Sequence, residues 1–247
     1  MENTHYNFEK EYTKKDPWNY NNSLKDCVRR SIYVSQLQRA FDIKKISRVF
    51  DAGCGEGYLT KDLVNHYPNV NVDATDISQN AVEIAKELNF SKSINYSALD
   101  LTEYTPTPNA YDLIICTEVL LYFTPKEVDQ TVSKFYNSLT EGGVLLISLM
   151  TDHKEKDNGK IELRKIPVEE ITGVLKQNNF HVTTVLPSLI LNKKLPHKIY
   201  WKLASMLFPK NKPQTIINYL RDITLSYPLE NCHKVSILAV KQPMANA

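Results

Sequence analysis

The chain alternates short apolar runs with segments of helical spacing between residues 47 and 150, and this feature restricts the possible folds most. The apolar runs are 47–53, 70–77, 93–100, 111–118 and 143–150, and the helical segments are 58–67, 79–88 and 125–139. Such alternation is typical of parallel strands joined by crossover helices. It predicts a doubly wound α/β sheet that binds ligands at the carboxyl ends of its strands.

Patterns outside this stretch complete the predicted fold. Residues 23–41 have helical spacing behind Ser23, 167–180 predict a helix, and 181–187 and 234–242 predict strands. Residues 187–234 are too many for a hairpin and contain helical patterns at 196–208 and 213–225. We expect a Rossmann-like, seven-stranded, mostly parallel sheet with an antiparallel last strand, an N-terminal helix, and a helical insertion between the last two strands.

The same patterns divide the chain into four parts. These are an N-terminal flap and helix (1–45), a Rossmann-like cofactor-binding core (46–186), a helical insertion that caps the substrate (187–234), and the last core strand and tail (235–247). The chain has 247 residues, 42% of them hydrophobic, which is ample for one globular core.

Composition argues against several classes of function. The formal net charge of +2 gives no general attraction to nucleic acid. No apolar run approaches the roughly 20 residues that a spanning helix needs, and no leader-like run begins the chain. Its cysteines lack C-x-x-C spacing, which argues against disulfides and metal sites: Cys27, Cys54, Cys116 and Cys232. We expect a cytoplasmic monomer or homodimer, without bound metal, membrane insertion or a nucleic-acid partner.

The segment 48–63, RVFDAGCGEGYLTKDL, contains three glycines between an apolar run and a helical one. In the dinucleotide fingerprint G-x-G-x-x-G the third glycine lets the helix pack closely on the strand. Here Gly57 comes one residue early and Tyr58 takes the fingerprint position, which disfavours a bound pyrophosphate. Five of the seven glycines lie in this loop and in the EGG sequence at 141–143, so both places need backbone freedom.

Acidic residues accompany three successive predicted strands. Asp51 precedes the glycines, and Asp76 ends the next strand, where a carboxylate accepts hydrogen bonds from ribose hydroxyls. Asp100 and Leu101 follow the third strand and suit an adenine amino group and an apolar ring face. This pattern indicates a ligand with donor-rich ends and no phosphate. The alternative is an ordinary tight turn with carboxylates that cap helices.

These motifs together resemble the class I S-adenosylmethionine-dependent methyltransferases. The resemblance covers residues 46–150 and rests on DAGCGEG, Asp76, LDL, TEVLLYF and EGG, in that order. It implies S-adenosylmethionine as the cofactor and S-adenosylhomocysteine as the product. It also implies the roles of the site residues: Gly53, Gly55 and Gly57 wrap the methionyl part, Asp76 binds the ribose, Asp100 and Leu101 flank the adenine, Thr117 and Glu118 face the sulfonium, and Asp51, Ile77 and Trp18 complete the cofactor-binding set.

A narrower resemblance comes from DPWNY, residues 16–20, together with TEVLLYF. This pair is similar to a bacterial group that includes the nodulation N-methyltransferases, which act on the amino sugar of a chitin-type oligosaccharide. It implies a small or saccharide-like acceptor. Alternatively, Trp18 and Tyr20 pin the N-terminal segment to the edge of the sheet. Both interpretations hold together if the pinned segment covers the cofactor.

A hydroxyl acceptor needs a general base, whereas an amine needs only to be neutral. His153 is the best candidate base because it directly follows the strand at 143–150, and His197 is a second candidate. Tyr122 is a candidate for orienting the acceptor. The alternatives are a solvated loop for His153 and core packing for Tyr122. The sequence TEVL replaces the D/N-P-P-Y/F signature after the fourth strand, which argues against nucleobase and amide acceptors.

The insertion supplies the only local charge argument, since its basic residues outnumber Asp222 and Glu230. The basic residues are Lys193, Lys194, Lys198, Lys202, Lys210, Lys212, Arg221 and Lys234. This excess favours an anionic acceptor, such as a phosphorylated, nucleotide-linked or carboxylated sugar. The alternatives are a solvated basic face and a helix at 196–208 that lies on a membrane surface.

We therefore predict a methyltransferase that acts on a small-molecule acceptor, at a hydroxyl of an anionic sugar or sugar-linked metabolite. Methylation of an amine or amino sugar is one alternative, and methylation of a protein or RNA is another. A module that binds the cofactor without catalysis is a third. A nicotinamide oxidoreductase is disfavoured by Tyr58.

Overall fold

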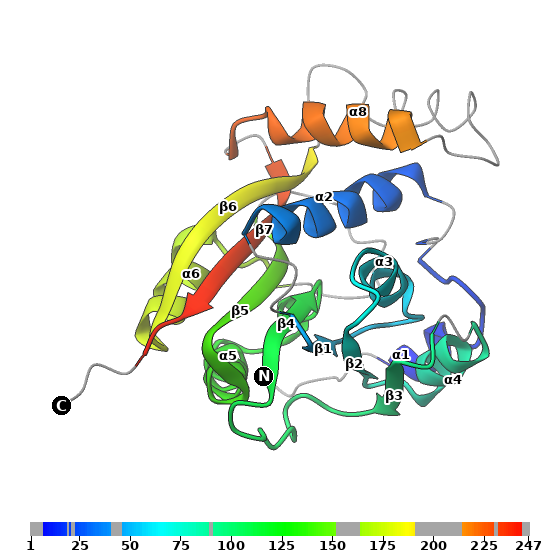
Figure 1. Ribbon diagram of the computed structural model, residues 1–247, viewed down its shortest axis with the longest axis horizontal. Helices are drawn as coiled ribbons and strands as arrows, with labels where there is room; N and C mark the ends of the chain where they lie inside the picture. Colours follow the sequence, from blue (N-terminus) through cyan, green and yellow to red (C-terminus); the bar gives the residue numbers. More distant parts are fainter. Residues whose placement is uncertain are drawn as a thin grey trace.

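The computed structural model describes residues 7–18, 20, 23–40, 46–88, 91–151, 164–190, 214–229 and 232–243. They form a seven-stranded sheet in the order β3-β2-β1-β4-β5-β7-β6 (Figure 1). The strands are β1 (Arg48–Ala52), β2 (Asn71–Asp76), β3 (Ile94–Ala98), β4 (Tyr111–Thr117), β5 (Leu139–Met150), β6 (Phe180–Ile190) and β7 (Cys232–Lys241). The first five strands pair in parallel, and β7 is antiparallel to both neighbours. The predicted Rossmann-like sheet with an antiparallel last strand is confirmed.

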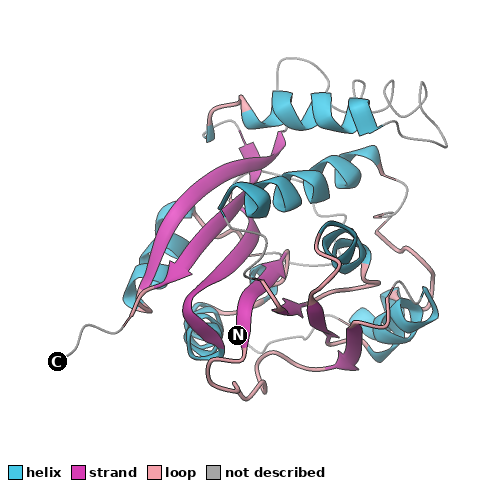
Figure 2. Ribbon diagram, viewed as in Figure 1, coloured by secondary structure: helices cyan, strands magenta, loops and turns pink. Residues whose placement is uncertain are grey.

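Helices cover both faces of this sheet (Figure 2). They are α1 (Phe8–Glu11), α2 (Leu24–Ala40), α3 (Tyr58–His66), α4 (Gln79–Leu88), α5 (Pro125–Ser138), α6 (Val168–Gln177) and α8 (Gln214–Leu225), with a short 3₁₀ helix, η2 (Leu120–Tyr122). Apolar side chains of α2, α3, α4 and α8 share one hydrophobic core. Those of α5 and α6 belong to the core on the other face.

Local sequence explains the central elements. Every residue from Val144 to Met150 in β5 is buried, because helices cover both faces of this central strand. Helix α5 begins with a capping box, in which the side chain of Thr124 accepts from the N–H of Glu127 while the Glu127 carboxylate accepts from the N–H of Thr124. Pro125 occupies the first turn, where its missing N–H costs nothing.

Some boundaries differ from the expected ones. Strand β5 begins at Leu139, directly after α5, so the EGG sequence lies inside the strand and not before it. Gly142 has a φ of 71°, and the pairing of β4 with β5 shifts register between Tyr111 and Leu113. Neither α1 nor η2 was expected from the periodicity, because each is a single turn.

Within the expected insertion at 187–234, the structure describes residues 187–190, which end β6, helix α8 with residues 226–229, and residues 232–234, which begin β7. Helix α8 lies beside α2 (Figure 1). The helix expected at 196–208 lies outside the described residues, and the division of the chain into four parts stays a prediction. Within the described segments, no helix combines the length and the apolar character that crossing a bilayer requires.

Candidate functional site

A cavity lies at the carboxyl ends of β1, β2 and β4, where the predicted fold places ligands. Most of the residues that the sequence assigned to the cofactor line it, together with the proposed acceptor residue: Trp18, Gly53, Gly55, Asp76, Ile77, Asp100, Leu101, Thr117, Glu118 and Tyr122. Asp51 and Gly57 do not line it. The fold therefore gathers residues that lie up to about a hundred positions apart in the chain.

The glycine loop is held against the end of β2. The N–H groups of Gly53 and Cys54 both donate to the carbonyl oxygen of Thr75, at 2.7 and 2.8 Å. Gly53 has a φ of 87°, and a Cβ atom there would lie 2.1 Å from Cγ2 of Val119. Only glycine fits this backbone position, so the main chain itself forms one wall of the cavity.

Asp76 ends β2, where its carboxylate is fixed by backbone donors. Oδ2 accepts from the N–H of Gly55 at 2.9 Å, and Oδ1 accepts from the N–H of Ser78 at 3.0 Å. Burial raises the pKa of Asp76, although these hydrogen bonds act in the opposite direction. Each carboxylate oxygen keeps a second lone pair for a hydroxyl donor.

Asp51 lies beneath the loop and outside the cavity. It is 1% exposed, and its Oδ2 accepts from Oγ1 of Thr60 in α3 at 2.5 Å. Burial raises its pKa to about 6. Gly57 likewise has a structural position, since it has a φ of 77° and serves as the N-cap of α3. We interpret both residues as supports of the glycine loop, because neither lines the cavity.

Asp100 and Leu101 line the cavity after β3. Oδ1 of Asp100 accepts from both the N–H and the hydroxyl of Thr102, at 2.8 Å each, which leaves Oδ2 without a partner among the described residues. Leu101 is buried, whereas Ile77 is 48% exposed although it lines the cavity. This part of the cavity thus combines apolar surface with one available carboxylate oxygen.

The N-terminal segment forms a further wall. Phe8 and Tyr12 line the cavity with Trp18, and the ring of Phe8 meets that of Tyr122 edge-on at a centroid distance of 4.9 Å. Glu9 fixes the segment to α4, where its carboxylate accepts from the N–H groups of Gln79 and Asn80, at 2.6 and 3.1 Å. The expectation that this segment covers the predicted cofactor site is consistent with these contacts.

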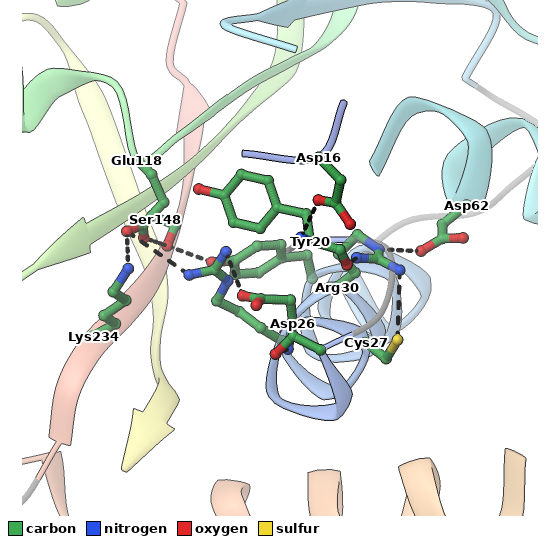
Figure 3. Close-up of polar contacts among 12 residues, drawn as sticks. Asp16, Tyr20, Asp26, Cys27, Arg30, Asp62, Glu118, Ser148 and Lys234 are labelled. Carbon is green, nitrogen blue, oxygen red and sulfur yellow. Dashed lines mark hydrogen bonds and ion pairs between the residues drawn. The ribbon is translucent and has the colours of Figure 1, made fainter. Parts of the chain in front are cut away.

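A buried group of charges lies beside Thr117, at the end of β4. Lys234 of β7 and Ser148 of β5 both donate to the carboxylate of Glu118 (Figure 3). Arg29 of α2 lies 3.9 Å from that carboxylate and pairs with Asp26 at 2.8 Å. Burial alone would raise the pKa of Glu118, but the charges of Lys234 and Arg29 lower it to about 2. Glu118 is therefore ionised at neutral pH.

Sequence patterns did not identify Arg29, Tyr33 or Ser148 as part of this site. Arg29 sits in an amphipathic helix, where a basic residue ordinarily faces water. It is 5% exposed in the structure. Lys234 was counted with the basic residues of the insertion that would attract an anionic acceptor. In the structure it forms an ion pair with Glu118 and is not available to an acceptor.

The expected catalytic base has no described position, because His153 and His197 both lie outside the described residues. Tyr122 lines the cavity, as a residue that contacts an acceptor must. Six of the eight basic residues counted in the insertion also lie outside the described residues. Among the residues that are described, no group of histidine, cysteine and carboxylate side chains could hold a metal ion.

Comparison with known proteins gives a consistent result. Residues 50–145 match a family model described as a methyltransferase domain. The chain is 30% identical over 132 residues to a malonyl-[acyl-carrier protein] O-methyltransferase of Acetivibrio thermocellus. This match covers 52% of this chain and 46% of the relative. The chain is 29% identical over 134 residues to a trans-aconitate 2-methyltransferase of Variovorax paradoxus, covering 54% and 49%. The match thus spans about half the length of these relatives.

Solved structures show the same fold. The N-methyltransferase NodS of Bradyrhizobium japonicum, in complex with S-adenosylhomocysteine, superposes with a TM-score of 0.63 at 17% identity, covering 95% of this chain and 96% of that one. A phosphoethanolamine N-methyltransferase of Haemonchus contortus, in complex with S-adenosylmethionine, gives a TM-score of 0.61 at 16% identity, covering 92% and 59%. Residues 50–145 thus match a methyltransferase domain, and the chain has the fold of these solved methyltransferases.

Proposed function

We propose that this chain transfers a methyl group from S-adenosylmethionine to an oxygen atom of a small, anionic, sugar-like acceptor. The observation that carries the proposal is the single cavity that unites the glycine loop, Asp76, Asp100 and Glu118 under the N-terminal segment. Methyl transfer is an in-line displacement, so an enzyme acts mainly by holding donor and acceptor in line and excluding water.

The residues fit the proposed cofactor. Asp76 presents a carboxylate that backbone donors hold in place, which suits the ribose hydroxyls. Asp100 offers one oxygen beside Leu101, which suits an adenine amino group next to an apolar face. The backbone of Gly53 leaves no room for a side chain, which allows close approach of the methionyl part. When bound, the cofactor supplies the electrophilic methyl group on its sulfonium.

Two observations favour an anionic oxygen acceptor. The relatives are named for malonyl-[acyl-carrier protein] and for trans-aconitate, and malonyl and aconitate groups both contain carboxylates. The cavity also contains a buried arginine, Arg29, whose charge suits an anion. A carboxylate nucleophile is already deprotonated and needs no base. A sugar hydroxyl does need one, so for that acceptor we keep His153 as the proposed base and Tyr122 as the residue that orients the acceptor.

Methylation of nitrogen is the alternative within the same site. It is supported by the likeness of DPWNY, residues 16–20, to the nodulation N-methyltransferase group. The aromatic walls formed by Trp18, Tyr20 and Tyr122 suit either a sugar ring or a small amine.

The test is a transfer assay with S-adenosylmethionine that carries a deuterated methyl group. The acceptor panel should contain uronic acids, sugar phosphates, di- and tricarboxylates, neutral sugars and amino sugars, with products identified by mass spectrometry. We expect a labelled methyl ester or ether on an anionic member. Transfer only to amino sugars would mean that the acceptor atom is nitrogen and not oxygen. Cofactor binding without transfer to any member of the panel would favour a non-catalytic module.

The matched variants for this assay are Asp76→Ala and Glu83→Gln. Asp76 lines the cavity, whereas Glu83 is an exposed carboxylate on α4. We expect the first substitution to abolish detectable transfer and the second to leave it unchanged.

A further inference from the structure

Arg29 has an unsatisfied donor in a buried position. Its side chain is 6% exposed, and one terminal nitrogen, Nη2, pairs with Asp26 at 2.8 Å. The other, Nη1, lies 3.9 Å from Oε2 of Glu118, which is too far for a hydrogen bond. Nε is buried and has no hydrogen-bond partner among the described residues. A buried donor of a permanently charged group is costly to leave without an acceptor.

The neighbouring arginine shows that this state is specific to Arg29. Nε of Arg30 donates to Asp62 at 2.7 Å, and its Nη1 donates to the carbonyl oxygen of Tyr20 at 2.6 Å (Figure 3). Both arginines line the cavity. Two donor groups of Arg30 are taken by protein acceptors, whereas Nε of Arg29 has no acceptor among the described residues.

The surroundings of Arg29 suit a bound group and not bulk water. Tyr20, Tyr33 and Glu118 also line the cavity. The guanidinium carbon lies 5.4 Å from the centre of the Tyr20 ring, which restricts where the side chain can move. Tyr33 is anchored in turn, because its hydroxyl is 2.5 Å from the hydroxyl of Ser148. Arg29 is thus held in place before any ligand arrives.

Charge indicates which group it would bind. Arg29 and Lys234 carry two positive charges, and Asp26 and Glu118 carry two negative ones, so the cluster is neutral. Both oxygens of the Glu118 carboxylate already have donors, Ser148 and Lys234, so Glu118 has little capacity left to satisfy Arg29. A carboxylate oxygen matches the spare Nε–H donor of the guanidinium in geometry and charge.

We propose that Arg29 is the carboxylate-binding residue of this cavity and that its free Nε–H donates to a carboxylate oxygen of a bound molecule. This inference rests on the proposed function. The carboxylate has two sources in that reaction, the amino-acid end of the cofactor and the acceptor, and the chemistry at Arg29 is the same for both.

Isothermal titration calorimetry distinguishes the sources. The probes are S-adenosylhomocysteine, 5′-methylthioadenosine, which lacks the amino-acid end, and malonate added to the complex with S-adenosylhomocysteine. The test variants are Arg29→Lys, which keeps a cation beside Asp26, and the double variant Asp26→Asn/Arg29→Gln, which leaves no buried charge unpaired. Arg39→Gln, at an exposed position of the same helix, is the control.

If the carboxylate belongs to the cofactor, both test variants should bind S-adenosylhomocysteine about ten-fold more weakly or worse, while 5′-methylthioadenosine binds as it does to the unchanged protein. If it belongs to the acceptor, S-adenosylhomocysteine should bind normally and malonate should lose a similar factor. The control should match the unchanged protein throughout.

The inference is wrong if the unchanged protein binds S-adenosylhomocysteine and neither test variant alters its affinity or that of malonate. An equal loss for S-adenosylhomocysteine and 5′-methylthioadenosine also overturns it, because that result indicates general damage to the cavity. If the unchanged protein binds neither adenosyl ligand, the proposed function itself fails and this inference fails with it.

Discussion

Lys234 of β7 donates to Oε2 of Glu118 at the end of β4, across 116 positions of sequence. Both side chains are nearly buried, with exposed fractions of 13% and 11%. The pair connects the antiparallel end of the sheet to the cavity, because Glu118 also lines the cavity. An ion pair removed from water in this way is stable only while both partners are present.

Replacement of Lys234 by methionine should therefore destabilise the protein strongly. The substitution leaves Glu118 ionised and buried with only Ser148 and the more distant Arg29 near it. We expect the free energy of unfolding, measured in urea, to fall by about 3 kcal/mol or more.

The double variant Glu118→Gln/Lys234→Met separates charge from packing, because it removes both members of the pair. It should recover much of the lost stability. A double variant no more stable than the single one would mean that packing of the lysine stem, and not an uncompensated charge, is responsible.

The second prediction concerns pH and Asp51. Burial raises the pKa of Asp51 to about 6 in the folded protein, above its ordinary value of about 3.9. The folded state then binds a proton more tightly than the unfolded state between these values. Stability should increase as the pH falls from about 7 to about 4, by about 2 kcal/mol from this group.

Urea unfolding at several pH values, compared with Asp51→Asn, measures this contribution. The asparagine variant should lose that part of the pH dependence. The hydroxyl of Thr60 donates to Asp51 and lowers the pKa of that carboxyl. Thr60→Val removes this hydroxyl, so it should raise the pKa of Asp51 and shift the pH dependence of stability to higher pH. An identical pH dependence in all three proteins would contradict the assignment.

Periodicity predicted the sheet and its helices because each element is defined by its own residues. The strand at 143–150 reads as buried from its apolar run alone, and it is central in the structure. The positions of the glycine loop and Asp76 at the cavity were predictable for a related reason. Both follow parallel strands, and the carboxyl ends of parallel strands lie at the same edge of the sheet, where ligands bind.

Other parts of the site could not be predicted from local sequence. Arg29 and Lys234 look like solvated basic residues, and only the packing of α2 and β7 around the end of β4 buries them next to Glu118. Asp51 has the spacing of a cavity residue, yet it points to Thr60 beneath the loop. Periodicity gives the face of an element, but not which buried side chains meet.

The third prediction concerns Gly53. A Cβ atom at this position would meet the stiff, branched side chain of Val119 at 2.1 Å, and the φ of 87° disfavours any other residue. Gly53→Ala should lower the free energy of unfolding by about 2 kcal/mol or more and weaken binding of S-adenosylhomocysteine. Thermal melts with and without this ligand measure both effects.

Gly173→Ala is the matched control for that substitution. Gly173 lies within α6, and a Cβ atom there would meet nothing within 4 Å. Alanine should stabilise the helix by about 0.5 to 1 kcal/mol and leave ligand binding unchanged. If Gly53→Ala behaved like this control, the loop would have more room than the structure shows.

The last prediction concerns the contact between Glu9 and α4. The Glu9 carboxylate accepts from the N–H groups of Gln79 and Asn80, so it satisfies two free donors at the start of the helix and holds the N-terminal segment over the cavity. Glu9→Gln keeps the shape of the side chain but removes its charge and one of its two acceptor oxygens. We expect it to lower the free energy of unfolding by about 1 kcal/mol.

The variant should also detach the N-terminal segment from the cavity more often, because the hydrogen bonds of Glu9 that cap α4 also hold this segment in place. We expect faster cleavage by trypsin after Lys14 or Lys15 and weaker binding of S-adenosylhomocysteine, whereas Glu83→Gln on the exposed face of α4 should change neither. Bound ligand should protect the unchanged protein from this cleavage. If Glu9→Gln lowers stability without altering cleavage or ligand affinity, Glu9 only caps α4, and other contacts such as that of Phe8 with Tyr122 hold the segment in place.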